Sequence, residues 1–502
     1  SGASNLAETK WNGIALSSLS VASTTSGNII NATSVTQPST GIEVWNVKST
    51  SPATITGGTV TGTSTAIFIN NFDGYNEDAP DGAHATITGM TLNPKASGIG
   101  IRVYDNPAST HANVQATIGA GVIINASDNG LVVENASASI PSMGAAAFVG
   151  QTINYIKLIN NANNITATTA TFNTKTGATA TLAENFDIED KILHKLDNSA
   201  LGFVLVKAGE DFVTPSSGSI QRGVDAASSG FIENIEAGTY VENVIVNKSL
   251  TILGPNDAIS GCAVRVPEAI VKPAAIALGS TPSTSGTIFR LGTVSGHIDV
   301  TIKGLTIDGN NAALGSGRLL NGVEVHTGAG IVNSIGSFDA NPGAFDVTMT
   351  VRNNIIKNLE RYGVLVDNTA SRPGVTGNDV SYNKIDNLPS GNTYGGLRGR
   401  AIAFEENQYG SANYNCISRV NVGWQDDNYN VASPGAATVV SNNTISSYHR
   451  GIFHNLQYQS ASNATISNNI ISAETMNNSG TDFGIELASI QTAVGATVTG
   501  NN

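Results

Sequence analysis

The sequence predicts an all-β protein, a right-handed parallel β-helix (solenoid) in which short strands stack coil upon coil. Three observations support this prediction: recurring strand phrases, a composition rich in strand and turn formers, and little charge. Charged residues make up 13% of the 502-residue chain, while Gly alone contributes 54 residues. This fraction of charged residues is about half the usual fraction for a soluble domain. The mixture lacks the Leu, Glu and Lys that long helices prefer and suits short strands separated by polar turns.

The strand phrases recur most clearly in the last third of the chain. Each repeat reads Asn-x-Ile, a short polar stretch, Gly or Ala, and then an alternating apolar strand. Such a short strand cannot bury its own apolar face, but stacking on the next coil gives it hydrogen bonds and an apolar interior. Asn at the corners tolerates a left-handed backbone and can form side-chain ladders between coils. The repeats cover residues 352–368, 382–407, 414–428, 442–455 and 468–489.

The first third has the same rhythm in a less regular form. Apolar strand phrases alternate there with turn segments rich in Gly and Thr. An ordinary β-sandwich is the alternative interpretation, and we favour the solenoid because the strand-and-turn layout recurs throughout. The strand phrases are Gly41–Asn46, Thr65–Asn70, Gly98–Asp105, Gly130–Asn135 and Tyr155–Asn160.

The middle of the chain breaks this rhythm with a dense group of charges. A short helical pattern there places Ile188, Ile192, Leu193 and Leu196 on one face. Solenoids need caps, because their terminal strands expose unpaired backbone and core. We therefore predict the last coils of a first β-helix module in residues 1–183, an end cap and connector in 184–218, and a second module in 219–502 that opens with a capping helix.

The charge balance argues against two classes of partner. The net charge is −13 and the isoelectric point is about 4.9. Nucleic acids and anionic membrane surfaces both attract clustered Lys and Arg, so we expect neither as a partner. No apolar run is long enough to span a bilayer, so the chain is not expected to be a membrane-spanning segment.

The cysteines and the chain ends give two further expectations. Cys262 and Cys416 lie far apart without metal-ligand spacing, so a disulfide is possible, but we favour two separate buried thiols. A large solenoid does not need the disulfide bonds that stabilise a small secreted domain. The chain starts at Ser1 without methionine and stops at Asn502 within a repeat-like phrase. We therefore expect a processed or partial segment of a longer protein.

One segment carries a family resemblance. The phrases SIQRGVDAASSG, AGTYVEN and NKSLTILG lie within Ser219–Asn256. This arrangement resembles the first coils of the pectin-lyase-like right-handed β-helix superfamily, where a capping helix precedes a strand, a corner and another strand. The repeats after Arg352 resemble the same group.

The charged connector before this segment resembles connectors of very large, multi-module surface proteins. These include the adhesins of gliding bacteria that use type IX secretion. The resemblance implies tandem β-helix modules, export to the bacterial cell surface, and an adhesive or structural role. It also implies two kinds of partner, which are further modules of the same polypeptide and an extracellular polysaccharide or surface.

Acidic side chains align when the last repeats are superposed on their Gly or Ala. Asp367, Glu405, Asp427 and Asn455 then share one outward position. Carboxylates on adjacent rungs, ~4.8 Å apart, repel each other and favour a cation or a basic neighbour. Calcium prefers clustered carboxylate oxygens, so calcium is the candidate cofactor, with Asp367, Glu405 and Asp427 as its candidate ligands. A solvated acidic stripe is the favoured alternative.

The neighbouring coil carries residue types that a polysaccharide lyase needs. A lyase uses a base to abstract a proton and an acid to protonate the leaving oxygen, and Tyr, His and Arg can serve. If the chain is an enzyme, the candidates are Tyr448, His449 and Arg450. The candidate glycan-binding residues are Trp424, Phe453, Arg398 and Arg400.

The favoured alternative for these residues is structural. Arg side chains would pair with the acidic column, and His454 would face inward beside Asp426. Trp424–Asp427 resembles one fragment of the polygalacturonase-type hydrolase site, but the Gly-His-Gly and Arg-x-Lys pieces that should follow are absent from the sequence. Hydrolysis is therefore disfavoured.

Two functions from different classes remain. We favour a non-catalytic segment of a large exported protein that serves as a rigid stalk and adhesive surface. The alternative is an acidic-polysaccharide lyase-like enzyme or a carbohydrate-binding module on the second β-helix. Because one fold can carry many functions, the choice between these two functions depends on the residues of the site.

Overall fold

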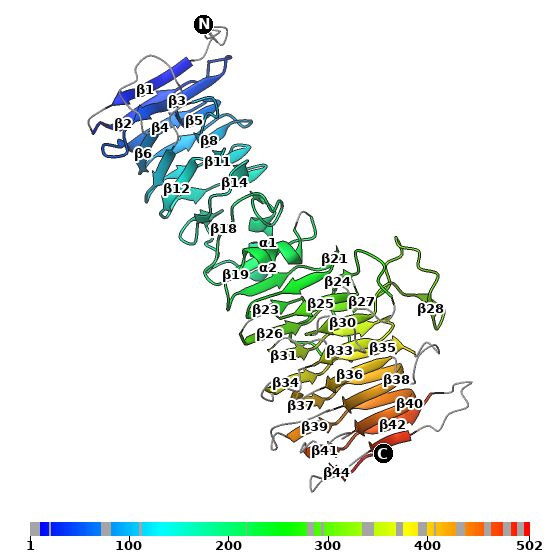
Figure 1. Ribbon diagram of the computed structural model, residues 1–502. Helices are drawn as coiled ribbons and strands as arrows, with labels where there is room; N and C mark the ends of the chain where they lie inside the picture. Colours follow the sequence, from blue (N-terminus) through cyan, green and yellow to red (C-terminus); the bar gives the residue numbers. More distant parts are fainter. Residues whose placement is uncertain are drawn as a thin grey trace. The chain divides into compact units, whose positions relative to one another are not determined.

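The computed structural model contains two compact units (Figure 1). Unit 1 comprises Ser1–Phe212 with Ser216–Gly218, and unit 2 comprises Val213–Pro215 with Ser219–Asn502. The structure describes residues 11–19, 22–71, 82–109, 113–216, 218–278, 286–292, 296–333, 346–367, 375–389, 399–405, 408–427, 437–455, 463–474, 483–488 and 496–502.

The described residues form an all-β, solenoid-like fold whose neighbouring strands pair in parallel, which confirms the predicted fold at this level. The short β28–β29 hairpin is antiparallel. None of the described helices is long and apolar enough to cross a membrane.

Unit 1 is a three-faced stack of coils, because successive strands along the chain join three faces in turn. The first face has the order β1-β3-β5-β8-β11-β14-β17, the second runs through β2, β4, β6, β9 and β12, and the third through β4, β7, β10, β13 and β16. The strands of the first face are β1 (Trp11–Leu19), β3 (Ser39–Val47), β5 (Thr65–Asn70), β8 (Ile99–Tyr104), β11 (Asn129–Glu134), β14 (Asn154–Ile159) and β17 (Ile192–Leu193).

The remaining strands of unit 1 build its other two faces and a separate two-stranded sheet of β15 and β18. They are β2 (Thr24–Asn31), β4 (Ala53–Thr61), β6 (Ala83–Thr88), β7 (Thr91–Asn93), β9 (Val114–Ile118), β10 (Ile123–Ile124), β12 (Ala138–Met143), β13 (Ala147–Phe148), β15 (Ile165–Thr166), β16 (Thr171–Phe172) and β18 (Val204–Leu205). β4 turns from one face to the next at Gly57 and Gly58, whose φ angles of 65° and 95° favour glycine.

The core of unit 1 is a set of apolar columns. Ile55, Ile87 and Ile118 lie in register on adjacent strands and are at most 1% exposed. The rings of Phe148 and Phe172 stack in parallel with centroids 5.5 Å apart. Along β9, buried and half-buried side chains alternate, as the period-2 sequence pattern predicts.

Unit 2 repeats this three-faced plan with the capping helix α2 (Ile220–Ala226), whose presence confirms the predicted helix. One face carries β20 (Ile232–Ile235), β23 (Leu250–Leu253), β26 (Ile298–Lys303), β31 (Val347–Arg352), β34 (Val375–Ser381), β37 (Gln408–Asn413), β39 (Ala437–Ser441), β41 (Asn463–Ser467) and β44 (Ala496–Thr499). β19 (Glu210–Val213) lies where the two units meet in the sequence.

The other two faces of unit 2 are joined through β38 (Cys416–Asp427) and β40 (Thr444–Asn455), which are long enough to turn from one face to the next. One of them contains β21 (Gly238–Val241), β24 (Ala269–Lys272), β27 (Thr306–Asp308), β32 (Ile355–Lys357), β35 (Lys384–Leu388) and β42 (Ile470–Ala473). The other contains β22 (Val244–Val246), β25 (Thr287–Leu291), β30 (Ala329–Val332), β33 (Tyr362–Val366), β36 (Arg400–Glu405) and β43 (Phe483–Ala488). The hairpin strands are β28 (Leu319–Leu320) and β29 (Val323–Glu324).

A buried asparagine ladder holds one corner of unit 2. Within the ladder each side-chain oxygen accepts the backbone N–H of the preceding rung, and each amide nitrogen donates to a backbone carbonyl. The residue before each ladder Asn adopts a positive φ between 56° and 64°. The ladder therefore has the corner chemistry that the Asn-rich repeats predict. Its members are Asn354, Asn383, Asn415, Asn443, Asn469 and Asn501.

Two sequence expectations are wrong. The helical pattern in the middle of the chain ends early, because α1 covers only Leu182–Glu189, and Ile192 instead pairs with Ile156 as part of a parallel sheet. Tertiary pairing overrides the local periodicity there. Cys262 and Cys416 are not separate thiols, since they form a disulfide with Cα atoms 5.8 Å apart.

Candidate functional site

The predicted acidic column exists as a strand register. Glu405 pairs with Asp427, and Asp427 pairs with Asn455, on three successive rungs of one sheet. Asp367 directly follows β33, whose last residue pairs with the residue before Glu405. The side chains of Asp427 and Asn455 lie outside the described residues. The strand register therefore places the backbones of Glu405, Asp427 and Asn455 next to one another.

The two residues of this column whose carboxylates are described, Glu405 and Asp367, are both held by contacts with neighbouring protein groups. The Glu405 carboxylate forms an ion pair with the Arg400 guanidinium, and the Tyr362 hydroxyl lies 3.5 Å from its Oε1. Burial raises the pKa of Tyr362, so this phenol stays protonated near neutral pH. Asp367 is 6% exposed, and its backbone exchanges hydrogen bonds with the side chain of Asn333. The described residues contain no group of three potential metal ligands, so a calcium site here stays a prediction.

The lyase candidates are also held by neighbours. The Asn321 amide donates to the Tyr448 hydroxyl over 3.1 Å, and Tyr448 is 8% exposed. Arg450 forms an ion pair with Glu486, and its guanidinium lies over the Phe453 ring, 4.3 Å from the centroid. His449 is half-buried and has an interaction partner. These contacts fix the side chains in place and occupy groups that proton transfer would need.

Both predicted stacking platforms are buried. Trp424 is 1% exposed and shares an inward column with Ile402 and Ile452, while Phe453 is 5% exposed. His454 Nδ1 lies 3.1 Å from Asp426 Oδ2, and both residues are fully buried, as the structural alternative predicts. A buried ring offers no face to a sugar, so neither aromatic serves as a platform in this conformation. Arg398 lies outside the described residues.

A segment that we call the first strap, residues 254–268, crosses the corner of several coils. It leaves the sheet after β23 and contacts the corner residues that follow β31 and β34, with Asn353 donating to Asp257 O and Gly261 donating to Tyr382 O. The disulfide then ties Cys262 to Cys416, in the coil that contains β37. The strap thus reaches four rungs beyond its origin, about 19 Å at ~4.8 Å per rung.

The first strap lies close against the coils. A Cβ atom on Gly261 would come within 2.2 Å of the Asn354 carbonyl oxygen, so only glycine permits this approach. Arg265 forms a two-bond ion pair with Glu268 and donates to the Ile259 carbonyl, which stiffens the returning half of the strap. The sequence gives one signal for this device, the Cys within a long polar insertion between two strands.

A second strap, residues 310–328, carries the β28–β29 hairpin. It leaves after β27 and places Asn321 against two later coils, because the Asn321 amide donates to Asn387 Oδ1 over 2.9 Å and to the Tyr448 hydroxyl. Arg318 of the same segment lies 3.6 Å from Glu360. This strap also reaches four rungs ahead, from β27 to β40. The two straps bind unit 2 along two different lines.

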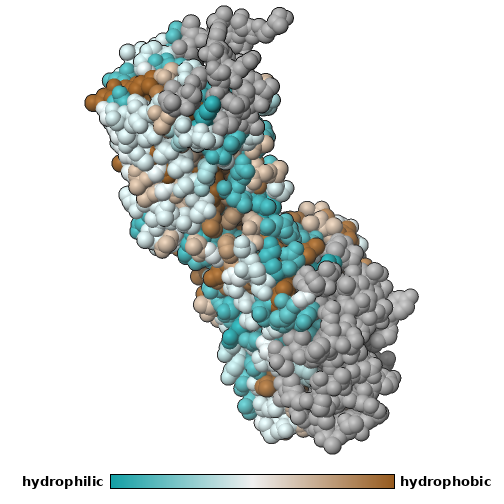
Figure 2. All heavy atoms as spheres, turned by 60° about the vertical axis from the view of Figure 1, so that its left-hand side comes forward, coloured by the Kyte–Doolittle hydropathy of each residue, from teal (hydrophilic) through white to brown (hydrophobic). Residues whose placement is uncertain are grey.

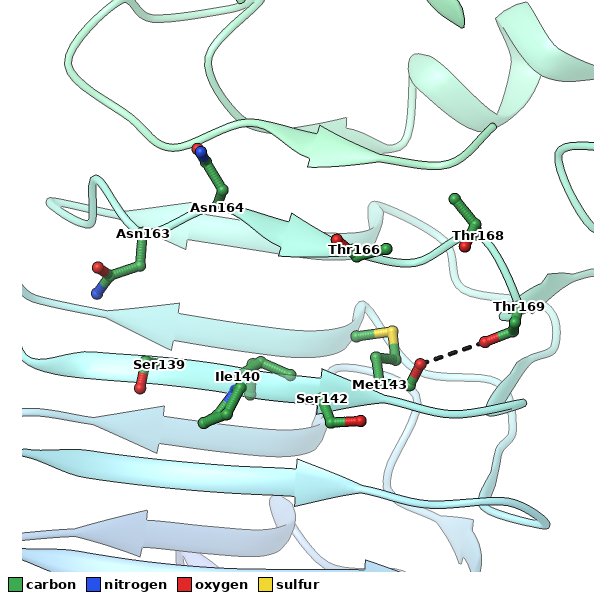
Figure 3. Close-up of a pocket in the computed structure, with 10 residues that line it drawn as sticks. Ser139, Ile140, Ser142, Met143, Asn163, Asn164, Thr166, Thr168 and Thr169 are labelled. Carbon is green, nitrogen blue, oxygen red and sulfur yellow. Dashed lines mark hydrogen bonds between the residues drawn. The ribbon is translucent and has the colours of Figure 1, made fainter. Parts of the chain in front are cut away.

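Unit 1 has a surface groove of about 460 Å³ that the sequence analysis missed (Figure 3). It lies between β12 and β15, which do not pair with each other; the recorded partner of β12 is β9, and that of β15 is β18. Pro141 lies within β12 and has no N–H to donate, and the register of β12 shifts between Ser139 and Ser142. A proline inside an apparent strand phrase is the signal that could have located this break.

No protein-family model and no curated protein matches the chain. The geometry of the two units is therefore the basis for assigning a function.

Proposed function

We propose that the chain is a non-catalytic segment of a large exported cell-surface protein and serves as a rigid stalk with an adhesive surface. In this proposal its two units are right-handed parallel β-helix modules in tandem, of the pectin-lyase-like kind. Export through type IX secretion and a part in gliding adhesion remain part of the proposal.

The disulfide-closed first strap carries this proposal. Disulfides persist in oxidising, extracytoplasmic environments, so the Cys262–Cys416 bond supports an exported location. A covalent tie across four rungs prevents the coils between its ends from separating under tension, which is the property that a stalk needs. The second strap adds hydrogen bonds across another line of coils.

The candidate catalytic residues support the same conclusion. Tyr448 lies under the second strap, Arg450 is paired with Glu486, and Glu405 is paired with Arg400. A structural role accounts for each of these contacts. The register of Glu405 with Asp427 favours the lyase-like or carbohydrate-binding alternative, which assays on pectate and alginate, with calcium and with chelator, would test. Release of unsaturated oligosaccharides would replace the stalk proposal with the enzymatic one.

Single-molecule stretching of the full chain by its two ends tests the stalk. With the disulfide intact, the segment from Cys262 to Cys416, which spans a sequence separation of 154, cannot extend. Reduction should release about 500–550 Å of additional contour length, at 3.3–3.6 Å per residue. We also expect the oxidised protein to resist unfolding at higher force than the reduced one. Equal unfolding forces and equal contour lengths in both states would contradict the proposal.

A further inference from the structure

The groove of unit 1 has a chemistry that differs from the acidic column of unit 2. Its lining contains hydroxyl and amide side chains above an apolar floor, and it contains no charged residue. Ile140 and Met143, which form the floor, are 5% and 7% exposed. Figure 3 shows these side chains on β12 below the Thr-rich segment around β15. The residues are Ser139, Ile140, Pro141, Ser142, Met143, Asn163, Asn164, Thr166, Thr168 and Thr169.

Several groups in the groove are fixed in place yet remain available. Asn163 donates through Nδ2 to the carbonyls of Ala136 and Ala138 over 2.9 and 2.8 Å, which orients the amide and leaves its Oδ1 as an acceptor. Thr169 donates to the Met143 carbonyl over 3.2 Å. Within the described part of the chain, four other lining hydroxyls form no hydrogen bond, those of Ser139, Ser142, Thr166 and Thr168.

The groove opens onto an uncharged surface. The strands of the second and third faces of unit 1 contain no Asp, Glu, Lys or Arg. Figure 2 shows much of one side of unit 1 in the pale colours of near-neutral hydropathy. One column of hydroxyl side chains crosses this surface in strand register and ends in the groove, and it consists of Thr24, Thr54, Thr86, Thr117 and Ser142.

We propose that this groove binds a neutral saccharide. Hydroxyl and amide groups that donate and accept match sugar hydroxyls, which also do both. The apolar floor can pack against the C–H face of a sugar ring, as most small-ligand sites combine apolar walls with a few oriented polar groups. No cation in the lining would compensate a carboxylate or sulfate, so desolvation disfavours acidic glycans. The inference rests on the proposed adhesive surface and names its ligand class.

Methionine NMR of the full chain tests the proposal at the site itself. The chain has four methionines, and Met143 lies in the groove, whereas Met90 and Met349 are core residues that are at most 1% exposed. With methyl-¹³C methionine, we would titrate neutral hexose, pentose and N-acetylhexosamine oligosaccharides, and oligogalacturonate as the acidic comparison. We expect a neutral oligosaccharide to shift the Met143 methyl signal and to leave the signals of Met90 and Met349 unchanged. Met143→Leu identifies the signal.

A matched pair of variants separates the groove from the rest of the surface. Thr166→Arg places a long charged side chain in the groove and should weaken binding at least tenfold. Thr301→Arg makes the same change at a partly exposed strand position of unit 2 and should leave binding unchanged. The proposal is overturned if no neutral oligosaccharide shifts Met143, if oligogalacturonate shifts it equally, or if Thr166→Arg has no effect. Each of these results leaves the stretching experiment, and hence the stalk proposal, unaffected.

Discussion

The two units hold their stacked coils together by different interactions. Both stack short parallel strands on three faces, so both must keep successive coils from separating. Unit 2 uses a disulfide, two straps and a buried Asn ladder, whereas unit 1 contains no cysteine and uses apolar columns and stacked rings. Unit 1 also has a break between β12 and β15, where a groove opens.

From this difference we infer that unit 2 provides mechanical strength and that unit 1 provides ligand recognition. Ties between distant coils restrict local opening, so unit 2 should behave as one cooperative body. Strands without charged side chains leave hydroxyl groups available for a ligand, and the described strands of the second and third faces of unit 1 fit that description. The comparison predicts different responses of the two units to mutation, which hydrogen exchange read by mass spectrometry can resolve unit by unit.

Removing the disulfide should produce the largest effect. Cys262→Ser with Cys416→Ser opens the loop that the disulfide closes, which spans a sequence separation of 154. A disulfide that closes a loop of this length stabilises the folded state by about 5 kcal/mol, because it lowers the entropy of the unfolded chain. We expect a loss of this order in the free energy of unfolding of unit 2, with unit 1 unchanged. Hydrogen exchange under denaturant provides the measurement. An equal loss in both units would break the comparison, because the tie would then stabilise the whole chain.

Removing one rung of the Asn ladder should have the next largest effect. Asn415→Ala leaves the buried N–H of Asn383 and the carbonyl of Val380 without their partners. Buried groups that lose hydrogen bonds cost about 1–3 kcal/mol each, so we expect unit 2 to lose about 3 kcal/mol. The measurement is chemical unfolding followed by exchange in unit 2.

The other end of the same ladder supplies the control. Asn501 makes the equivalent bonds to Asn469 and Ile466, but its own side chain is half-buried. Water can replace a lost partner there, so Asn501→Ala should cost less than Asn415→Ala. If both variants cost the same, burial of the ladder would not be the source of its strength.

The sequence predicted the repeating parts of the molecule better than the parts that occur once. The Asn-Asn-x-Ile phrase identified the corners at Asn353 and Asn442, because each coil repeats the same local chemistry. Alternation along β38 could also have placed Trp424 inward, since it lies two residues from the buried Asp426. The pairing of Cys262 with Cys416 depends on a contact across 154 residues, and no local pattern encodes it.

The candidate site shows the same limit. Aligning the repeats predicted the register of Glu405 with Asp427, which the strand pairing contains. It did not predict that Arg400 would pair with Glu405 or that Asn321 would reach Tyr448, because the straps are insertions that interrupt the repeats. The groove arises from a missing strand pair beside Pro141, so it too is a departure from the repeat.

The smallest predicted effect is a pH dependence confined to unit 1. Glu189 is 7% exposed beside His194, and burial raises the pKa of its carboxyl above the ordinary value of 4.5. His194 Nδ1 accepts the Val204 N–H over 2.9 Å, so its Nε2 carries the proton that faces Glu189, 2.5 Å away. A carboxyl with a raised pKa contributes stability that is fully present below pH 4.5 and is lost as the pH rises through the folded-state pKa.

Glu189→Gln tests this assignment. The Gln carbonyl can still accept from His194 Nε2, but it does not ionise, so unit 1 of the variant should lose less stability than wild type as the pH rises from 4 towards neutrality. Glu184→Gln is the matched control, because the same substitution falls on the exposed first turn of α1, where hydrogen bonds to Thr181 lower the pKa of Glu184. That variant should remove a contribution of the opposite sign. If Glu189→Gln leaves the pH profile of unit 1 unchanged, the buried carboxyl is not its source, and charge would have to be sought on the first face of unit 1, where Arg102 and Glu134 are paired.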